Sequence, residues 1–334
     1  MAQIDSQLST GLVGLDGMLK GLIPGDNLVW QVESVEDYAP FLPAYCRAAA
    51  ERSIPLIYFR FAKHRQLIAD GGYAEVHHCD PQQGLEGFLS SIHRVIERHG
   101  RGGYYVFDCL SDLAYDWCSD QMLGNFFMLT CPFLYDIEAI AYFALLRNRH
   151  SYHATAAISD TTQVLLDIYR HKEHIYIHPW KVQGRYSATM HMPHIWQDDT
   201  FRPITDSATV SEIMTSVPWG RLESSGLHFG IWNRTRARAE EVIRDTESGK
   251  ATDAQQLDCL KTMLRMAITR EPRILALAEK YMTLQDVLDV EDRMIGTGLI
   301  GGKAVGMLLA RAIIRADASH LQKRSEPHDS FYIG

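Results

Sequence analysis

The chain has 334 residues, of which 46% are hydrophobic and 22% are charged, and its formal net charge is -8. This composition is typical of a globular protein that can bury a core. The net acidity argues against a nucleic-acid-binding protein, because phosphate backbones are held by clustered Lys and Arg. The six cysteines lie far apart with no CxxC pair, and no signal peptide is evident, which predicts reduced thiols in a cytoplasm. No apolar run reaches the length of a membrane span, so no membrane partner is expected.

The first two hundred residues alternate between strand-like and helix-like segments. Strands are predicted at residues 27–32, 55–62, 104–113 and 139–146, and helices at 41–53, 81–100 and from about 114 to 138. Alternating strands and helices need crossover connections, so we expect an α/β fold with a mostly parallel sheet flanked by helices. Residues 163–192 instead contain short β segments in tight succession, which predicts a hairpin appended to this sheet. The first domain is expected to end near residue 200.

The rest of the chain has a different pattern. Residues 201–292 begin with a polar connection and are predicted to form a mostly helical linker or small domain, whose Leu, Met and Ile stripes indicate packing surfaces. Residues 293–334 hold a glycine-rich loop that leads into a helix. The chain ends in "DSFYIG", a strand-like segment with no evident partner after it.

Three stretches of the first domain resemble the RecA-like ATPases of the KaiC type. They are "LSTGLVGLDGMLKGLIPGDNLVWQV", which is similar to the opening of that family, "YYVFDCLSDL", which is similar to its Walker B strand, and "YIHPWKVQGRYS", which is similar to its late hairpin. The resemblance covers residues 1–200 and implies a RecA-like fold.

The phosphate-binding residues of such a site are missing. The P-loop would fall on residues 33–40, "ESVEDYAP", which contain no Gly and no Lys, and no Ser or Thr at the metal position. Pro40 also lacks the N–H that could bind phosphate, and three carboxylates would repel a triphosphate. The family's catalytic acid pair would fall near Ala62 and Lys63, and Gln183 stands where the family has an arginine. The sequence therefore predicts a RecA-like domain with a degenerate P-loop.

Asp108 remains at the Walker B position. A strand-end Asp can bind magnesium, or it can act as a helix cap or turn former. Without its partners, the structural role is the stronger interpretation. Whether the mouth beyond the first strand is open or filled by Tyr38 and Phe41 is the structural question that this interpretation raises.

The second motif is "GLIGGKAVGMLLARAI", residues 298–313. Glycines at a loop-to-helix junction let the backbone approach a phosphate, and Lys303 would supply charge, although close packing at a helix start explains such a loop about as often. The motif resembles the start of the ATP-grasp domain of phosphoenolpyruvate synthase and pyruvate phosphate dikinase, with Ala304 in place of a following glycine. The resemblance implies that Gly301, Gly302 and Lys303 bind ATP in the parent protein. Its implied partners are the rest of that domain, a phosphohistidine domain and a phosphoenolpyruvate-binding domain, with ATP and magnesium as cofactors.

Other constellations favour no catalytic or metal site. The histidines of "HKEHIYIH" cannot all point to one face of a strand, and the ligand-type residues of "EVHHCD" are too close together to encircle one ion. No GxSxG elbow and no recognisable Cys/His setting is present. Asp108, Asp112 and Asp116 could form an acidic cluster whose geometry the spacing does not fix.

Three hypotheses follow. The first is a cytoplasmic, non-catalytic RecA-like regulatory or docking module of a phosphoenolpyruvate synthase-like or pyruvate phosphate dikinase-like phosphotransferase, from which no turnover by this chain alone is expected. The second is a RecA-like ATPase with an atypical phosphate loop that uses Asp108 for magnesium. The third is an interaction scaffold that binds no nucleotide. Assembly into a homo-oligomer stays open, because Gln183 replaces the arginine of the usual nucleotide-bridged interface.

Overall fold

The computed structural model describes residues 8–69, 74–198, 200–216, 230–322 and 330–334. The chain divides into two compact units, Met1–His228 and Phe229–Gly334. Three clusters of buried apolar residues, two large and one small, lie in the described part of the first unit, and a fourth lies in that of the second. No helix within the described ranges combines the length and the apolarity needed to cross a membrane.

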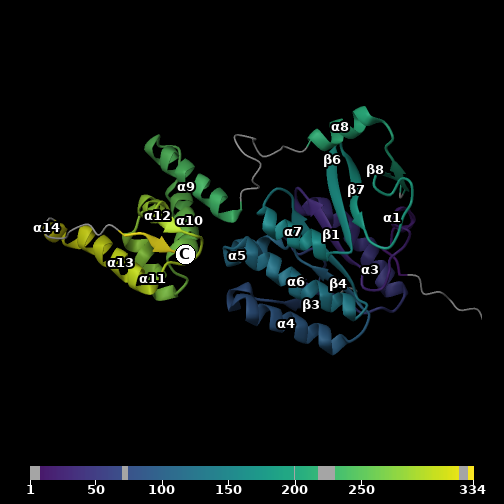
Figure 1. Cartoon of the computed structure of the whole chain (residues 1–334), viewed down its shortest axis with the longest axis horizontal. Coiled ribbons are helices and arrows are strands. Elements are labelled where there is room, and N and C mark those ends of the chain that lie inside the picture. Colours follow the sequence, from purple (N-terminus) through teal and green to yellow (C-terminus); the bar gives the residue numbers. More distant parts are fainter. Residues whose placement is uncertain (1–7, 70–73, 199, 217–229, 323–329) are drawn as a thin grey trace, which may run out of the picture. The chain divides into compact units, whose positions relative to one another are not determined.

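A nine-stranded sheet forms the centre of the described part of the first unit (Figure 1). Its strands are β1 (Asn27–Val32), β2 (Leu56–Arg60), β3 (Glu75–His78), β4 (Tyr104–Phe107), β5 (Ile140–Leu146), β6 (Val164–His171), β7 (His174–Val182), β8 (His194–Gln197) and β9 (Thr200–Pro203). Their order is β3-β2-β4-β5-β1-β6-β7-β8-β9. The pairs from β3 to β6 are parallel and those from β6 to β9 are antiparallel. The predicted α/β fold with a mostly parallel sheet is thus confirmed.

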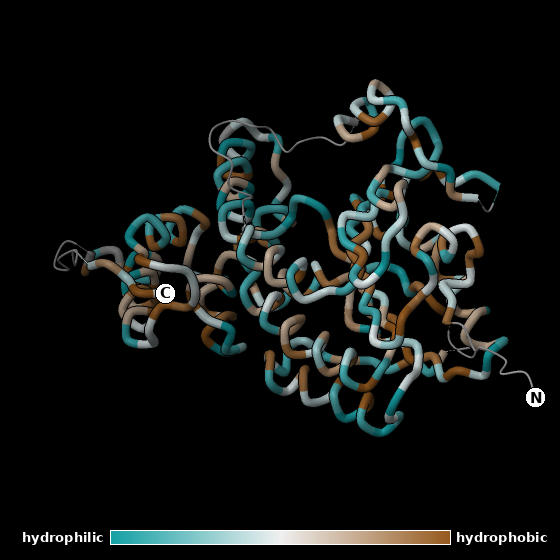
Figure 2. The backbone as a smooth tube through the Cα atoms, turned by 45° about the vertical axis from the view of Figure 1, so that its right-hand side comes forward, coloured by the Kyte–Doolittle hydropathy of each residue, from teal (hydrophilic) through white to brown (hydrophobic). Residues whose placement is uncertain are grey.

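Helices cover both faces of this sheet. They are α1 (Val13–Leu19), α2 (Val35–Tyr38), η1 (Ala39–Phe41), α3 (Leu42–Glu51), η2 (Pro81–Gln83), α4 (Gly84–His99), α5 (Ser111–Trp117), α6 (Asp120–Asp136), α7 (Tyr152–Thr161) and α8 (Ser207–Ser216). Strand residues alternate between the faces: Trp30 packs in the cluster with α1 and α3, and its neighbour Val29 packs in the cluster with α4, α5 and α6. The helices show apolar and polar positions side by side, as amphipathic helices do (Figure 2).

The boundaries of two elements are instructive. The prediction for β1 is correct at both ends, whereas the predicted strand 104–113 is too long, because β4 ends at Phe107. The chain turns after Asp108, where the N–H groups of Asp112 and Leu113 bond to the carbonyls of residues 109 and 110. Asp108 therefore lies just beyond the end of β4.

The second unit is mainly helical in the residues described. It contains α9 (Ile231–Glu247), α10 (Asp253–Met263), the π-helical turn η3 (Leu264–Ile268), α11 (Pro272–Tyr281), α12 (Leu284–Glu291), α13 (Gly302–Asp317), α14 (Ser319–Gln322), β10 (Met294–Ile295) and β11 (Tyr332–Ile333). The apolar stripes of its helices form one core, as predicted. The strand-like ending of the chain pairs in parallel with β10, a partner that precedes it in the sequence.

Candidate functional site

The loop after β1 forms a short capped helix in place of a phosphate cradle. Ser34 is the N-cap of α2, and the carboxylate of Asp37 accepts hydrogen bonds from the Ser34 N–H (3.3 Å) and the Ser34 hydroxyl (3.1 Å). This capping box engages the backbone N–H groups of Ser34 and Asp37, so two donors at this helix start already have partners within the chain.

Aromatic side chains fill the space beyond the C-terminal end of β1. The Tyr38 side chain is fully buried and Phe41 is 1% exposed. The Phe41 ring stacks on the Trp30 indole with a centroid separation of 4.4 Å, and the Tyr38 ring lies 6.1 Å from the same indole. The chain's own aromatic rings therefore fill this space.

The three carboxylates of this loop do not converge. Asp37 is buried, and Arg170 donates to its carboxylate at 2.7 Å, whereas Glu33 and Glu36 are exposed. Glu36 borders a pocket of about 580 Å³ at the same edge of the sheet. The pocket is lined by Val35, Glu36, Ala39, His64, Arg65, Gln66, Leu67 and Ala69. A triphosphate at this edge would meet Glu36 and little fixed positive charge beyond Arg65.

Asp108 is fully buried and its carboxylate accepts hydrogen bonds from four protein donors. Tyr58 donates its hydroxyl to Oδ1, while Oδ2 accepts from Arg60 Nη1 at 2.5 Å and from the N–H groups of Phe61 and Ala62 at 2.8 Å each. Burial, followed by the nearby Asp108 carboxylate, raises the pKa of Tyr58, so the phenol keeps its proton at neutral pH. Each carboxylate oxygen offers about two lone pairs, so the three donors at Oδ2 fill that oxygen, while Oδ1 accepts from Tyr58 and lies 3.6 Å from His64 Nε2. Asp108 ties the segment after β2 to the end of β4.

The neighbouring acids have separate partners. The Lys63 N–H donates to Asp112 Oδ2 at 3.2 Å, and the Lys63 ammonium lies 3.3 Å from Asp116 Oδ1. Burial raises the pKa of Asp112. Asp108, Asp112 and Asp116 therefore lie near one another, but their carboxylates do not converge on one empty site. Ala62 and Lys63 supply no acid where the family's catalytic pair would stand.

Two basic residues of the late hairpin, Lys181 and Arg185, donate hydrogen bonds to other segments of the first unit. Arg185 donates to both carboxylate oxygens of Asp26, at 2.7 and 3.1 Å, and to the Gly21 carbonyl at 2.7 Å. Lys181 donates to the carbonyls of Ser159 and Asp160. Arg185 thus binds the turn before β1, and Lys181 binds the end of α7. Gln183, by contrast, is exposed.

A Ser–His–Asp chain that sequence reasoning missed lies at the end of β5. Ser111 Oγ and His150 Nε2 are 2.7 Å apart, and His150 Nδ1 and Asp120 Oδ1 are also 2.7 Å apart. The distances match those of a nucleophile and its base. However, all three side chains are buried and Ser111 Oγ also accepts the Leu146 N–H. None of these three residues lines the pocket beside Glu36, so the Ser–His–Asp series joins α5, α6 and the segments around β5.

The glycine-rich loop of the second unit is organised differently. Gly301 is the N-cap of the sixteen-residue helix α13, and no side chain of the described residues caps it. The Val305 N–H bonds to the Gly301 carbonyl, so the N–H groups of the first turn before Val305 have no intrahelical acceptor. Lys303 lies in this first turn and is exposed. The three residues Gly301, Gly302 and Lys303 are thus together at one open helix start.

Packing does not explain the first two of these glycines. A Cβ built on Gly301 or Gly302 would meet no described atom within 4 Å. By contrast, Gly298 has a φ of +138°, and a Cβ there would lie 3.1 Å from the carbonyl carbon of Gly334. Backbone geometry therefore requires glycine at Gly298, whereas the space beside Gly301 and Gly302 is empty.

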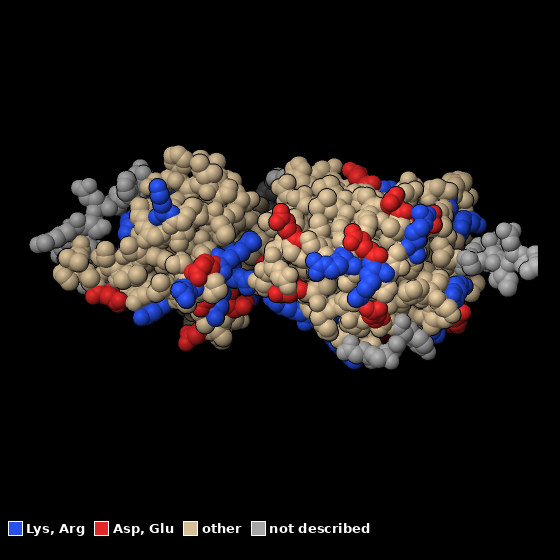
Figure 3. Space-filling model, turned by 90° about the horizontal axis from the view of Figure 1, so that it is seen from below, with Lys and Arg blue, Asp and Glu red and all other residues tan. Residues whose placement is uncertain are grey.

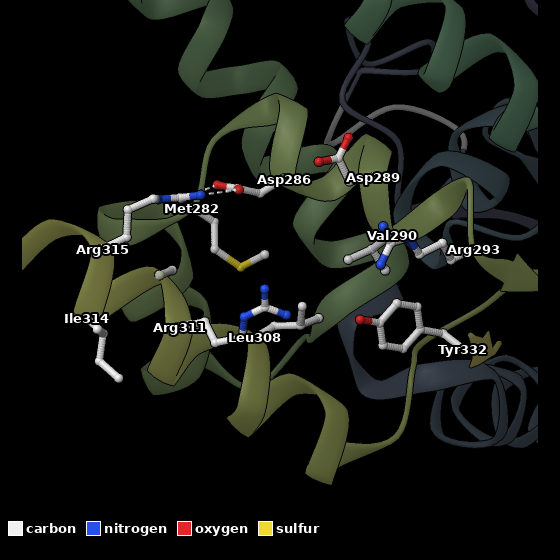
Figure 4. A pocket seen from close by; sticks show the side chains of 11 residues that line it. Met282, Asp286, Asp289, Val290, Arg293, Leu308, Arg311, Ile314, Arg315 and Tyr332 are labelled. Atoms are coloured by element: carbon white, nitrogen blue, oxygen red, sulfur yellow. Dashed lines mark hydrogen bonds and ion pairs between the residues drawn. The ribbon is translucent and has the colours of Figure 1, made fainter. Parts of the chain in front are cut away.

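A polar pocket of about 430 Å³ lies elsewhere in the second unit (Figure 4). Its lining residues are Met282, Asp286, Asp289, Val290, Arg293, Leu308, Arg311, Ala312, Ile314, Arg315 and Tyr332. Arg315 donates to both oxygens of Asp286, at 2.7 and 2.6 Å. The pocket is lined by later turns of α13, and Lys303 is not among its lining residues.

The surface charges are mixed. On the face shown in Figure 3, Lys and Arg residues lie among Asp and Glu residues.

No protein-family model matches the chain, and no curated protein matches it in sequence.

Proposed function

We propose that the first unit is a non-catalytic RecA-like module that regulates or docks a phosphotransferase of the phosphoenolpyruvate synthase or pyruvate phosphate dikinase type. The glycine-rich loop of the second unit would begin the ATP-grasp domain of that protein. The partners would be the remaining ATP-grasp, phosphohistidine and phosphoenolpyruvate-binding domains, in a cytoplasm. The parallel sheet with its antiparallel edge supports the RecA-like part of this proposal.

The observation that carries the non-catalytic role is the state of Asp108. A magnesium ligand needs an accessible oxygen lone pair directed at the ion. Arg60 and two backbone N–H groups occupy Oδ2 of Asp108, and Oδ1, which accepts from Tyr58, belongs to a fully buried side chain. The aromatic residues beyond β1 also fill the space where a nucleotide phosphate would lie. The residues present do not fit magnesium and triphosphate at this edge.

The residues at the start of α13 do fit a phosphate. An uncapped helix N-terminus presents N–H donors and the positive end of the helix dipole, and Lys303 adds a charge. The space beside Gly301 and Gly302 permits close approach of a ligand to the backbone. In the parent protein these residues would bind and orient the ATP phosphates, and ATP with magnesium would supply the transferred phosphoryl group.

Calorimetric titration of the chain with ATP and magnesium tests this proposal, with Lys303→Ala as the variant and Lys250→Ala as a matched exposed-lysine control. We expect no binding at the first unit, so any heat of binding should be lost in Lys303→Ala and kept in Lys250→Ala. Binding that survives Lys303→Ala would locate the nucleotide in the first unit and would favour the atypical ATPase.

A second measurement separates the docking module from a scaffold unrelated to phosphotransferases. The first-unit surface would be tested for binding to an isolated ATP-grasp or phosphoenolpyruvate-binding domain of the synthase type. Binding with micromolar or better affinity supports the module, and its absence at high concentration contradicts it.

A further inference from the structure

Three metal-ligating side chains meet at the β3 edge of the sheet. Glu75 and His77 are two residues apart on β3, so they project from the same face of the strand. His99 is the last residue of α4. One carboxylate oxygen and the two imidazole nitrogens lie within 4.8 Å of one another, and this is the one such group of three found in the described residues.

The two imidazole nitrogens are close to the carboxylate without being hydrogen-bonded to it. His77 Nε2 lies 2.8 Å from Glu75 Oε1, and His99 Nε2 lies 3.3 Å from Glu75 Oε2. Both nitrogen atoms are buried, yet neither makes a hydrogen bond of acceptable geometry within the part of the chain that is described. A simple ion pair would direct an N–H at a carboxylate oxygen, and buried nitrogens without partners are costly.

We propose that Glu75, His77 and His99 form a binding site for a zinc-type divalent cation, with two neutral imidazoles and one carboxylate as ligands and water in the fourth position. Zinc accepts this ligand set in tetrahedral geometry at about 2.0–2.2 Å, which separates the ligand atoms by about 3.3 Å. His99 Nε2 lies at that separation from Glu75 Oε2, and His77 Nε2 lies closer, 2.8 Å from the other carboxylate oxygen, Oε1. The Glu75 side chain is 50% exposed, so an ion and its water can enter from solvent.

One neighbouring charge opposes the cation. Arg98 Nη2 lies 3.1 Å from Glu75 Oε1, and its side chain is 61% exposed. A bound cation would displace this guanidinium, which is free to turn into solvent. Arg98 is thus predicted to weaken the site, whereas in a purely ionic cluster it would be one of the stabilising members.

The site would also join two elements. β3 is the edge strand of the sheet, and His99 is near the C-terminal end of α4. A metal held by both would resist separation of the helix end from the edge strand, so the ion should raise the melting temperature of the folded protein.

Cobalt(II) titration of the metal-free full chain provides the test, because tetrahedral cobalt sites absorb visible light. We expect one equivalent of cobalt to produce these bands and zinc to remove them. His77→Ala, His99→Ala and Glu75→Gln should each weaken binding at least about tenfold, since loss of an outer partner alone costs roughly that much. His78→Ala, an exposed neighbour on β3, should leave binding unchanged.

Arg98→Ala distinguishes the metal site from a cluster of ion pairs. This variant should bind cobalt as tightly as the wild type or more tightly, and zinc should still raise its melting temperature. Circular dichroism would confirm that each variant is folded, and Glu75→Gln changes an exposed side chain if the histidine variants do not fold. Absence of the bands in the wild type, or bands that persist in Glu75→Gln and His99→Ala, would overturn the proposal.

Discussion

The end of β1 and the start of α13 are the two places where the sequence resembles a nucleotide site, and they differ in what occupies them. Beyond β1, Tyr38 and Phe41 are buried against Trp30. At α13, Gly301 and Gly302 border empty space. A loop-to-helix junction alone therefore says little about ligand binding, because the side chains that fill or leave the adjacent space decide it.

The two units also differ in how they hold a buried acid. Asp108 in the first unit accepts four hydrogen bonds. Glu291 in the second has a side chain that is 6% exposed, and its Oε1 makes no hydrogen bond within the described residues. The first acid should stabilise its unit as a carboxylate, and the second should destabilise its unit when it ionises.

Asp108→Ala is the change with the largest expected effect. Removal of the carboxylate leaves Arg60, whose side chain is 15% exposed, without its counter-ion and leaves buried N–H donors unpaired. Breaking a buried pair in this way costs about 3–5 kcal/mol. Chemical denaturation of the full chain would measure the loss as a lower free energy of unfolding of the first unit.

Two controls belong to that experiment. Asp108→Asn keeps the shape of the side chain but removes its charge and replaces one acceptor oxygen by an NH2 donor. The remaining oxygen can still accept from the donors, so this variant should cost less than Asp108→Ala. Glu36→Ala, an exposed acid at the same edge, should change stability by less than about 0.5 kcal/mol. A near-neutral Asp108→Ala would show that the fold does not depend on this carboxylate and would return weight to a magnesium-binding role.

The sequence predicted the path of the chain better than its side-chain contacts. Four of the six residues of β1 are apolar, with polar Asn27 and Gln31 among them, and the strand follows a turn, so it could be assigned at both ends. The Gly100 end of α4 was also predictable, because a residue with a φ of +75° at a helix C-cap favours glycine. These features are local in the sequence.

The partners of Asp108 could not be predicted in the same way. Tyr58 and Arg60 are 50 and 48 residues away from it in the sequence, and they meet it only because β2 and β4 are adjacent. The sequence held one signal for this contact: Tyr58 and Arg60 are two residues apart in β2, which puts both side chains on one face of the strand. The same limit applies to His99, which joins Glu75 and His77 from the end of a helix.

Glu291 should make the stability of the second unit depend on pH. Burial raises its pKa from the ordinary 4.5 to about 7, and Arg236, 3.9 Å away, offsets this in part. Between these two values the folded state keeps a proton that the unfolded state has released, so stability falls as pH rises through this window. The loss should be on the order of 1–3 kcal/mol.

Glu291→Gln isolates this effect. The variant should be more stable than the wild type at pH 8 and similar to it at pH 5, as measured by denaturant unfolding at the two pH values. Glu241→Gln, an exposed acid on α9, provides the matched control and should show no such difference. A Glu291→Gln variant that is less stable at pH 8 would mean that the carboxylate is stabilised by its pairing with Arg236.

Gly302→Ala should have the smallest effect and tests whether the start of α13 is open. A Cβ at Gly302 meets nothing within 4 Å, and alanine favours a helix over glycine, so the variant should be unchanged or more stable by up to about 1 kcal/mol. Gly298→Ala in the same loop should instead destabilise, because its φ of +138° and the 3.1 Å contact with Gly334 exclude a side chain. Thermal unfolding of the two variants measures the contrast. If Gly302→Ala also destabilised the second unit, packing would account for this glycine, and the case for an open phosphate-binding helix start would fail.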